Sequence, residues 1–287
     1  MREPYIMMSL PPTLQSEIRR CEVPVEEVHL RVNGRAEIAA NGKRMLLESI
    51  TTENDIRILM DAATNYSLYA AQEYLREGFI TTKDGCRIGL AGLVTRDSRG
   101  VSAIRKISSL CIRFAREFPG AADGIYRHIC RQKGSVLIFG PPGCGKTTLV
   151  RDLISQISDC LEERVGIVDE RFEICAAVEG VPAMKIGERC DVISGSAKEE
   201  GLLMLLRGCA PQWIAVDEIT SPRDAAAMER CACCGVLLIA TAHAAEPGDL
   251  LRRPLYKHIV AQNIFTHYVH MRRDHSYTIC SAEALYD

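Results

Sequence analysis

The stretch GPPGCGKTT, residues 140–148, has the residue types and spacing that bind nucleotide phosphates. It matches G-x-x-x-x-G-K-[ST], in which a glycine-rich loop presents backbone N–H groups to phosphate oxygens at the start of a helix. The apolar run SVLIF precedes the loop and a helical segment follows it, which is the context that the motif requires. Pro141 and Pro142 carry no N–H group, so the donors are expected in the second half of the loop. The predicted nucleotide ligands are Gly140, Gly143, Cys144, Gly145, Lys146, Thr147 and Thr148.

Two of these residues have a specific expected task. The Lys146 ammonium is expected to reach the β- and γ-phosphates, and the Thr147 hydroxyl to bind Mg²⁺. No [NT]-K-x-D pattern, which would read guanine, follows the later strands. We therefore expect ATP with Mg²⁺ rather than GTP.

Two apolar runs end in Val-Asp-Glu, so each delivers a pair of carboxylates to the end of an expected strand. They are VGIVDE, with Asp169 and Glu170, and WIAVDE, with Asp217 and Glu218. In P-loop ATPases that use a dedicated catalytic Glu, the Asp that supports Mg²⁺ lies on the strand that is third in chain order, which here is WIAVDE. Asp217 is thus expected to hold the Mg²⁺ shell, and Glu218 to orient and polarise the attacking water.

The next strand ends in IATAHAAE, which brings two further polar side chains to the same edge. Thr241 and His243 are expected beside the γ-phosphate, where both would sense hydrolysis. A histidine that follows a strand is often a loop residue without a role, but the position of His243 directly after this strand favours a functional one.

The residues alone leave two readings open for Asp169 and Glu170, which lie on the second strand, further from the phosphate loop. In the first, they are a solvated strand end or pair with Arg171 or Arg189. In the second, they hold the water shell of the metal or meet an incoming arginine.

The elements that position these residues alternate between strand and helix from about residue 121. The predicted strands are 135–139, 164–169, 212–217 and 236–241, and the predicted helices are 146–157, 197–209 and 222–232. Such alternation predicts a parallel sheet with helices on both faces and ligands at the carboxyl ends of its strands. The expected fold is α/β, with a RecA-like P-loop ATPase domain and a mostly parallel sheet over residues 119–287.

Residues 1–118 are expected to form a smaller α+β domain. Its predicted elements are short strands turned at Asn33-Gly34 and Asn41-Gly42, a helix over 51–64 with Thr52 and Asp55 as a capping box, a second helix over 67–78 stopped by Gly78, and a hairpin turned at Asp84-Gly85. The arginine-rich segment 103–120, which ends in Pro-Gly, is expected to be a linker.

Composition limits the function classes. The net charge is −2, so no overall basic field indicates a nucleic-acid or lipid surface as partner. No run of 18 apolar residues predicts a transmembrane helix, and the N-terminal apolar patch is too short for a signal peptide, so we expect a cytoplasmic protein. The 13 cysteines are then small apolar residues, and Cys231, Cys233 and Cys234 lack the spacing of a zinc site and are expected to be buried at a helix end.

The order of these motifs resembles that of the type II/type IV secretion ATPase superfamily. The superfamily has the same series of motifs along the chain: the phosphate loop, then an acidic box (here VGIVDERFEI, with Asp169 and Glu170), then LLRGCAPQWIAVDEI, then TAH. The amino-acid sequence of these stretches is most similar to one branch of the superfamily, the stage III sporulation protein AA family of spore-forming bacteria. The matching stretches are EEVHLRVNGR, SLYAAQEYLREGFITTKDGCRIGLAG, ISSLCIRFARE, PPGCGKTTLVRDLI, VGIVDERFEI, GLLMLLRGCAP and VDEI, which span most of residues 26–245.

The resemblance implies a hexameric ATPase ring in the mother-cell cytosol. The ring would power a membrane-embedded, secretion-like channel between mother cell and forespore, and partners would hold it at the inner membrane. The acidic box of the superfamily, which here contains Asp169 and Glu170, faces the nucleotide. This favours the functional reading of both residues, with Glu170 among the catalytic candidates. Arginines of the N-terminal domain or linker usually approach the phosphates, often those of a neighbouring subunit. The candidates here are Arg87, Arg105, Arg113 and Arg116, with Arg105 and Arg113 preferred.

The chain departs from the superfamily at three positions. It has Asp217 where many members have Gly, Thr220 where Gly is usual and Cys111 where Asn is frequent. Two alternatives to a secretion motor stay open. One is a nucleic-acid-stimulated P-loop motor, although no nucleic-acid-binding module is visible and no direct nucleic-acid partner is expected. The other is a structural ring subunit that binds ATP and barely hydrolyses it, against which the intact Asp217 and Glu218 pair argues.

Overall fold

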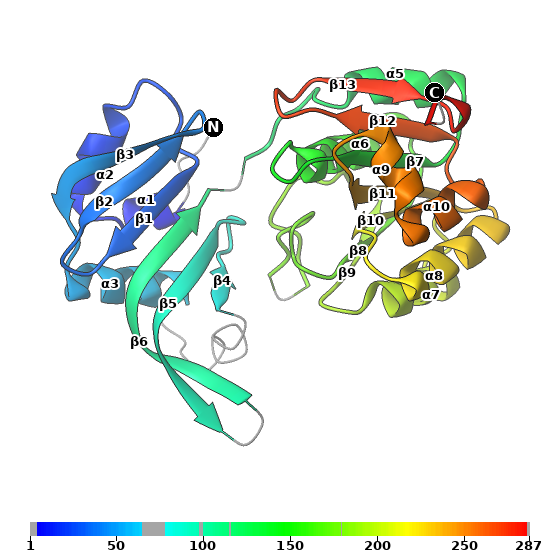
Figure 1. Cartoon of the computed structure of the whole chain (residues 1–287). Coiled ribbons are helices and arrows are strands. Elements are labelled where there is room, and N and C mark those ends of the chain that lie inside the picture. Colours follow the sequence, from blue (N-terminus) through cyan, green and yellow to red (C-terminus); the bar gives the residue numbers. More distant parts are fainter. Residues whose placement is uncertain (1–4, 65–77, 98–99, 115, 179, 286–287) are drawn as a thin grey trace. The chain divides into compact units, whose positions relative to one another are not determined.

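The computed structural model describes residues 5–64, 78–97, 100–114, 116–178 and 180–285, without the side chains of 96, 97, 100–103 and 105. The chain forms two compact units, Met1–Arg116 and Glu117–Asp287, shown in blue to cyan and in green to red in Figure 1. Each unit is described by itself below.

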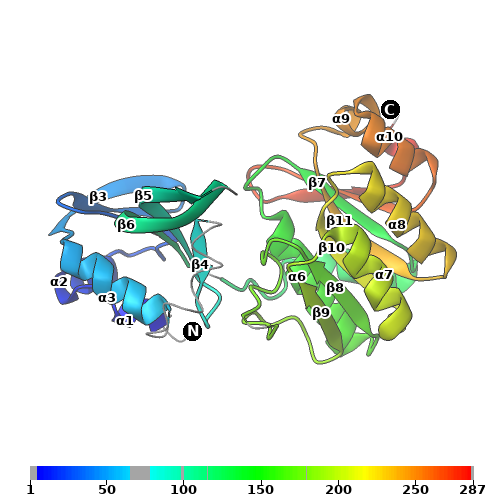
Figure 2. The same cartoon turned by 90° about the horizontal axis from the view of Figure 1, so that it is seen from below.

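The N-terminal unit is an antiparallel sheet whose strands lie in the order β3-β2-β1-β6-β5-β4. The strands are β1 (Glu27–Arg31), β2 (Arg35–Ala40), β3 (Lys43–Ile50), β4 (Phe79–Thr81), β5 (Arg87–Asp97) and β6 (Gly100–Arg113). The helices are α1 (Tyr5–Met8), α2 (Pro12–Arg19) and α3 (Glu53–Ala63), and Figure 2 shows them on one side of the sheet. Their apolar residues form one core with the alternate, fully buried positions of β1, such as Val28 and Leu30. The intervening residues of β1 therefore lie on the other face of the sheet.

Two turn and cap predictions for this unit are confirmed, at Asn41-Gly42 and at Thr52, whereas Asn33-Gly34 is not a left-handed pair, since only Asn33 has positive φ. Asn41 and Gly42 have φ of 49° and 71°, the left-handed pair that a two-residue hairpin turn requires. Thr52 and Asp55 form the expected capping box at the start of α3. The second helix, expected over 67–78, lies outside the described residues except for Gly78.

The expected arginine-rich linker is instead a strand for most of its length. Residues up to Arg113 belong to β6, which pairs with both β1 and β5 inside the sheet. Its residues alternate, since Leu110 and Ile112 are fully buried and Cys111 is on the other face. This period of two is the signature of a half-buried strand, and it outweighs the local density of arginines.

The second unit is a sheet in the order β13-β12-β7-β11-β10-β8-β9, parallel except for β13. Its strands are β7 (Val136–Gly140), β8 (Val165–Asp169), β9 (Cys190–Ser194), β10 (Trp213–Glu218), β11 (Leu237–His243), β12 (His267–Met271) and β13 (Tyr277–Cys280). Its helices are α5 (Asp123–Arg131), α6 (Lys146–Cys160), α7 (Lys198–Gly208), α8 (Pro222–Cys233), α9 (Pro247–Arg252), α10 (Pro254–Ala261) and the short η1 (Glu283–Leu285). The four predicted strands and three predicted helices are present, and the sequence reading missed α5, α9, α10, β9, β12 and β13.

Helices cover both faces of this sheet, as the sequence predicted. Figure 2 shows α6 on one face and α7 and α8 on the other. Apolar residues of α7, α8 and α10 form a core with Leu137 and Phe139, and those of α5 and α6 pack on Val136 and Ile138. Every residue of β7 is therefore buried, which explains its uninterrupted apolar sequence.

The cysteine group at the end of α8 is only partly as expected. Cys231 is buried in the core, whereas Cys233 and Cys234 are exposed. Across the described ranges, no helix has the length and apolar character needed to cross a membrane.

Candidate active site

The phosphate loop joins β7 to α6 in a conformation that only small residues allow. Gly143 and Gly145 have φ of 76° and 95°, in the left-handed region that favours glycine. At Gly140 a Cβ atom would lie 2.5 Å from the Met271 carbonyl oxygen and 2.9 Å from Cys144 Sγ. The backbone therefore comes close to its neighbours at the strand end.

The backbone N–H groups of this loop form a set of free donors. Leu149 donates to the Gly145 carbonyl, but within the described part of the chain the N–H groups of Gly143 to Thr148 have no acceptor. They surround the N-terminus of α6, where the helix dipole also favours an anion. This donor set fits a nucleotide phosphate.

The Lys146 side chain is buried at the base of the loop. Its Nζ donates to the carbonyls of Gly140, at 3.0 Å, and Pro141, at 2.9 Å, and lies 3.0 Å from Nδ1 of His243. Burial lowers the pKa of the Lys146 ammonium, while the nearby carboxylates of Glu218 and Asp217 act in the opposite direction. Lys146 is thus a cation that the protein has partly desolvated, which strengthens its attraction to a phosphate.

His243 connects this lysine to Glu218. Because an ammonium only donates, Nδ1 of His243 accepts from Lys146, which leaves the ring proton on Nε2. Nε2 lies 3.1 Å from Glu218 Oε2 and donates to it. The sequence placed these three residues at one edge of the sheet, but not this series of contacts, which we call the Lys146–His243–Glu218 series.

Asp217 lies directly before Glu218 and is buried. Its Oδ1 accepts a hydrogen bond of 3.3 Å from the Thr241 hydroxyl on the neighbouring strand β11, so Thr241 orients Asp217. A carboxylate oxygen and the half-buried Thr147 hydroxyl are the hard oxygen ligands that Mg²⁺ prefers. The residues present therefore fit Mg²⁺, with Asp217 and Thr147 as the groups that would hold it.

Asp169 differs from the first reading, in which it is a solvated strand end. It is fully buried, and its two oxygens accept hydrogen bonds of 2.8 to 3.1 Å from the N–H groups of Glu173, Ile174 and Cys175. Burial raises the pKa of the Asp169 carboxyl, although these N–H groups stabilise its charge. The residue organises the loop that follows β8 and is shielded from solvent.

Glu170 forms an ion pair, but not with the expected arginines. Its carboxylate accepts from the ammonium of Lys198, which is 3% exposed at the start of α7. Arg189 instead lies 3.7 Å from Glu162. The pairing with Arg171 or Arg189 is therefore wrong, because the chain folds α7 back onto the end of β8.

The candidate arginines of the N-terminal unit have partners within that unit. Arg113 Nε donates to Glu27 Oε1 at 2.8 Å, Arg116 donates to the Val25 carbonyl, and the Arg87 guanidinium lies 3.8 Å above the Phe79 ring. The side chain of Arg105 lies outside the described residues. The approach of any of these arginines to a phosphate stays a prediction.

The sequence did not predict two contacts at the site, one made by a histidine and one by an arginine. Nδ1 of His275, in the turn between β12 and β13, lies 3.1 Å from the Cys144 carbonyl and supports the phosphate loop. Arg253 donates to the His243 carbonyl at 2.7 Å and fixes the end of β11. Neither lies in a recognisable motif, and the β7–β12 pairing that brings His275 to the loop joins segments more than a hundred residues apart.

A pocket of the second unit includes one of the predicted ligands. Thr148 lines it together with Phe118, Pro119 and Arg151. Its other α6 residues, Asp152 and Ser155, lie further along the helix than the phosphate loop.

Comparison with known proteins places the chain in a family. The family model described as "Sporulation stage III, protein AA" matches residues 12–286. Stage III sporulation protein AA of Bacillus subtilis (strain 168) is 36% identical over 254 residues, which cover 87% of this chain and 83% of that protein. Protein SEEDLING PLASTID DEVELOPMENT 1 of Arabidopsis thaliana is 28% identical over 254 residues, which cover 85% of this chain and 34% of that protein.

Solved structures share the fold at low identity. The pilus retraction motor PilT with bound ADP gives a TM-score of 0.60 at 16% identity, covering 90% of this chain and 76% of PilT. The ATPase DotB of Yersinia pseudotuberculosis gives 0.62 at 14% identity, covering 94% and 76%. These likenesses confirm the expected α/β fold with its antiparallel N-terminal sheet unit. With the match of the family model to nearly all of its length, the chain belongs to the stage III sporulation protein AA family.

Proposed function

We propose that this protein is a Mg²⁺-dependent ATPase that drives a sporulation-specific channel or secretion complex between mother cell and forespore. The observation that carries the proposal is the Lys146–His243–Glu218 series beside the buried Asp217, at the edge where the phosphate loop begins. Family membership and the fold shared with the ADP-bound motor PilT support it.

The residues of the site divide the work of phosphoryl transfer. The free N–H groups of the loop and the Lys146 ammonium hold the phosphates. Thr147 and Asp217 would hold Mg²⁺, which would neutralise part of the phosphate charge. Glu218 orients and polarises the attacking water, and the His243 Nε2–H group keeps its carboxylate in place.

His243 also gives the site a means of reporting hydrolysis. Its two nitrogens join the phosphate-binding cation to the residue that positions water. When Lys146 engages a phosphate, its contact with Nδ1 weakens, and His243 and the β11 end that carries it are free to change position. Because Arg253 holds the His243 carbonyl, such a change passes to the start of α10.

The working form that we propose is a homo-oligomeric ring, taken as hexameric from the resemblance, in which arginines of one subunit complete the site of another. It would act in the mother cell and reach the membrane through embedded channel partners. A site completed in trans makes the ATPase rate per subunit rise with protein concentration until the ring is formed. Steady-state phosphate release with ATP and Mg²⁺, measured over a wide range of protein concentrations, tests this. A rate per subunit that is constant over the range would contradict a shared site.

We expect Glu170→Gln to lower kcat by about tenfold, which is far less than loss of the catalytic base would cause. The substitution removes a charge that pairs with buried Lys198 and fixes the end of β8, but leaves Glu218 untouched. Lys198→Met removes the other partner of the same ion pair and is the matched variant. The two single variants and the double variant should show similar losses, because all three break one interaction. Loss of turnover as complete as in Glu218→Gln would show that Glu170 itself takes part in the chemistry.

A further inference from the structure

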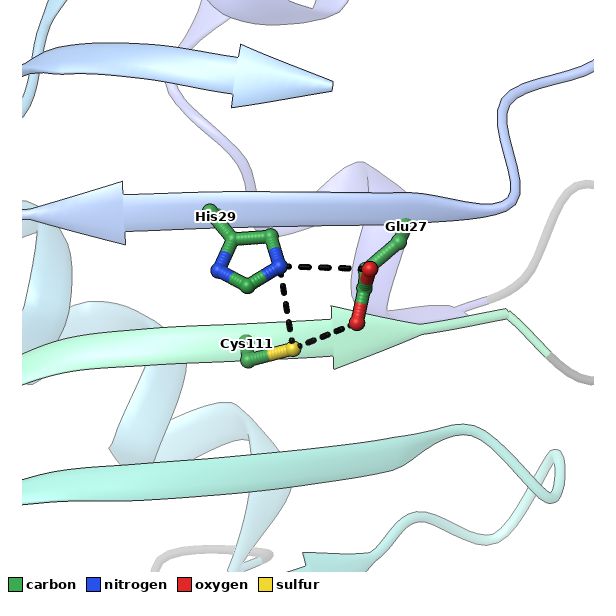
Figure 3. A group of neighbouring side chains, drawn as sticks. All are labelled: Glu27, His29 and Cys111. Carbon is green, nitrogen blue, oxygen red and sulfur yellow. Dashed lines mark hydrogen bonds and ion pairs between the residues drawn. The ribbon is translucent and has the colours of Figure 1, made fainter. Parts of the chain in front are cut away.

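Three side chains with metal-binding atoms meet on the sheet of the N-terminal unit, on the face away from its helices. Glu27 and His29 are two residues apart on β1 and so point to the same face, and Cys111 is the direct partner of His29 on β6. Figure 3 shows the carboxylate, the imidazole and the thiol converging between the two strands. Among the described residues, they form the one group of three or more His, Cys, Asp or Glu whose ligand atoms all lie within 4.8 Å of one another.

The separations between these atoms suit a small ion. His29 Nε2 lies 3.4 Å from Cys111 Sγ and 3.2 Å from Glu27 Oε2, and the sulfur lies 2.8 Å from Glu27 Oε1. Zn²⁺ bonds of about 2.3 Å to sulfur and about 2.0–2.2 Å to nitrogen and oxygen, at tetrahedral angles, put such ligands about 3.4–3.6 Å apart. The imidazole is therefore already placed, and the sulfur and carboxylate need to separate by less than about 1 Å.

The surroundings leave room for that movement. Gly89 on β5 is the neighbour of Cys111 across the sheet, and it presents no side chain to this face. Arg113 donates from Nε to Glu27 Oε1 at 2.8 Å, so an outer partner fixes the carboxylate.

We propose that Glu27, His29 and Cys111 bind one Zn²⁺ ion, with a water molecule as the fourth ligand. Thiolate and imidazole are the ligands that select Zn²⁺ over Mg²⁺ and Ca²⁺, and three protein ligands leave one tetrahedral position open. On binding, the proton of the Cys111 thiol leaves for solvent as the sulfur–metal bond forms, so no oxidant or reductant is involved.

A nucleophilic cysteine is the competing reading of a Cys–His pair. Reactive cysteines act as thiolates. Here the Cys111 thiol donates to the Glu27 carboxylate at 2.8 Å, and this negative neighbour disfavours a thiolate. Without a metal the sulfur is a donor to Glu27 and not a nucleophile, whereas a divalent cation offsets the charges of both side chains.

Cobalt titration of the metal-free, reduced full-length chain tests the site. We expect one equivalent of Co²⁺ to give the thiolate-to-metal charge-transfer band and the intense visible bands of a tetrahedral ion, and Zn²⁺ to displace it. Cys111→Ser should remove the charge-transfer band, and His29→Gln and Glu27→Gln should each weaken Zn²⁺ binding by about tenfold or more in competition with a chromophoric chelator. Cys21→Ser, which changes a half-buried thiol of the same unit, is the matched control and should bind like the wild type.

Several results would overturn the proposal. They are a wild-type chain that binds neither ion, a charge-transfer band that persists in Cys111→Ser, and equal Zn²⁺ affinities in the wild type, His29→Gln and Glu27→Gln. X-ray absorption at the zinc edge of the wild-type complex does not depend on the folding of any variant. It should show one sulfur at about 2.3 Å and the remaining ligands at about 2.0–2.2 Å. A shell with no sulfur, or with several, would place the ion elsewhere.

Discussion

Glu218→Gln is expected to retain ATP binding and to lower turnover by about 10²–10⁴-fold. Glutamine has the shape of glutamate, and its carbonyl oxygen still accepts from His243 Nε2, so the Lys146–His243–Glu218 series keeps its geometry. The amide carries no charge and cannot polarise the attacking water or take its proton. The loss should therefore fall on kcat, while the dissociation constant of Mg·ATP stays close to that of the wild type.

The measurement is paired phosphate release and equilibrium nucleotide binding, with Glu200→Gln as control. Glu200 is exposed in the first turn of α7, so the substitution Glu200→Gln removes the same charge at a distance from the site. Because Glu218→Gln holds ATP without turning it over, its mass with ATP and Mg²⁺ also reports the assembled ring. Full turnover in this variant would remove Glu218 from its assigned role.

Lys146→Ala is expected to weaken ATP binding by about 100-fold or more, and turnover should disappear with it. A hydrogen bond to a charged group contributes about 1.5–3 kcal/mol, and about 1.4 kcal/mol corresponds to a factor of ten in affinity. Lys146 combines such bonds with a full charge in a buried position. Its removal is therefore expected to cost more binding free energy than the loss of a single hydrogen bond. The substitution also leaves the Gly140 and Pro141 carbonyls and His243 without their donor.

Equilibrium titration with Mg·ATP and a thermal unfolding curve separate lost binding from lost folding. Lys257→Ala, at an exposed position of α10, removes an equal charge and should bind ATP normally. A folded Lys146→Ala chain with wild-type affinity would contradict the assignment of the phosphate loop as the nucleotide site.

The acidic box, with Asp169 and Glu170, shows what a strand-end sequence pattern can predict and what it cannot. VGIVDE and WIAVDE are alike in sequence, and chain order separated them, because the sheet places β10 between β8 and β11. Chain order did not reveal that Asp169 turns back onto the N–H groups of its own loop, or that Glu170 meets Lys198. Both depend on the path of the chain after β8, which has no repeating pattern to read.

The sequence by itself determined the features that are written locally. The phosphate loop, the capping box at Thr52 and the turn at Asn41-Gly42 depend on residues a few positions apart, whose backbone preferences and hydrogen bonds are settled within one turn or helix end. The alternation of apolar strands and helices likewise settled the α/β class and the edge at which Asp217, Glu218 and His243 meet, because parallel strands end on the same side.

Only the tertiary structure decided the contacts between segments far apart in the chain. The Lys146–His243 contact, the support of Cys144 by His275 and the convergence of Glu27 and His29 with Cys111 each join residues more than eighty positions apart. β6 also became an interior strand because its alternate apolar residues were needed by a core formed with β1 and β5. Such contacts follow from strand register and the burial of apolar faces, which are properties of the whole sheet and of no single motif.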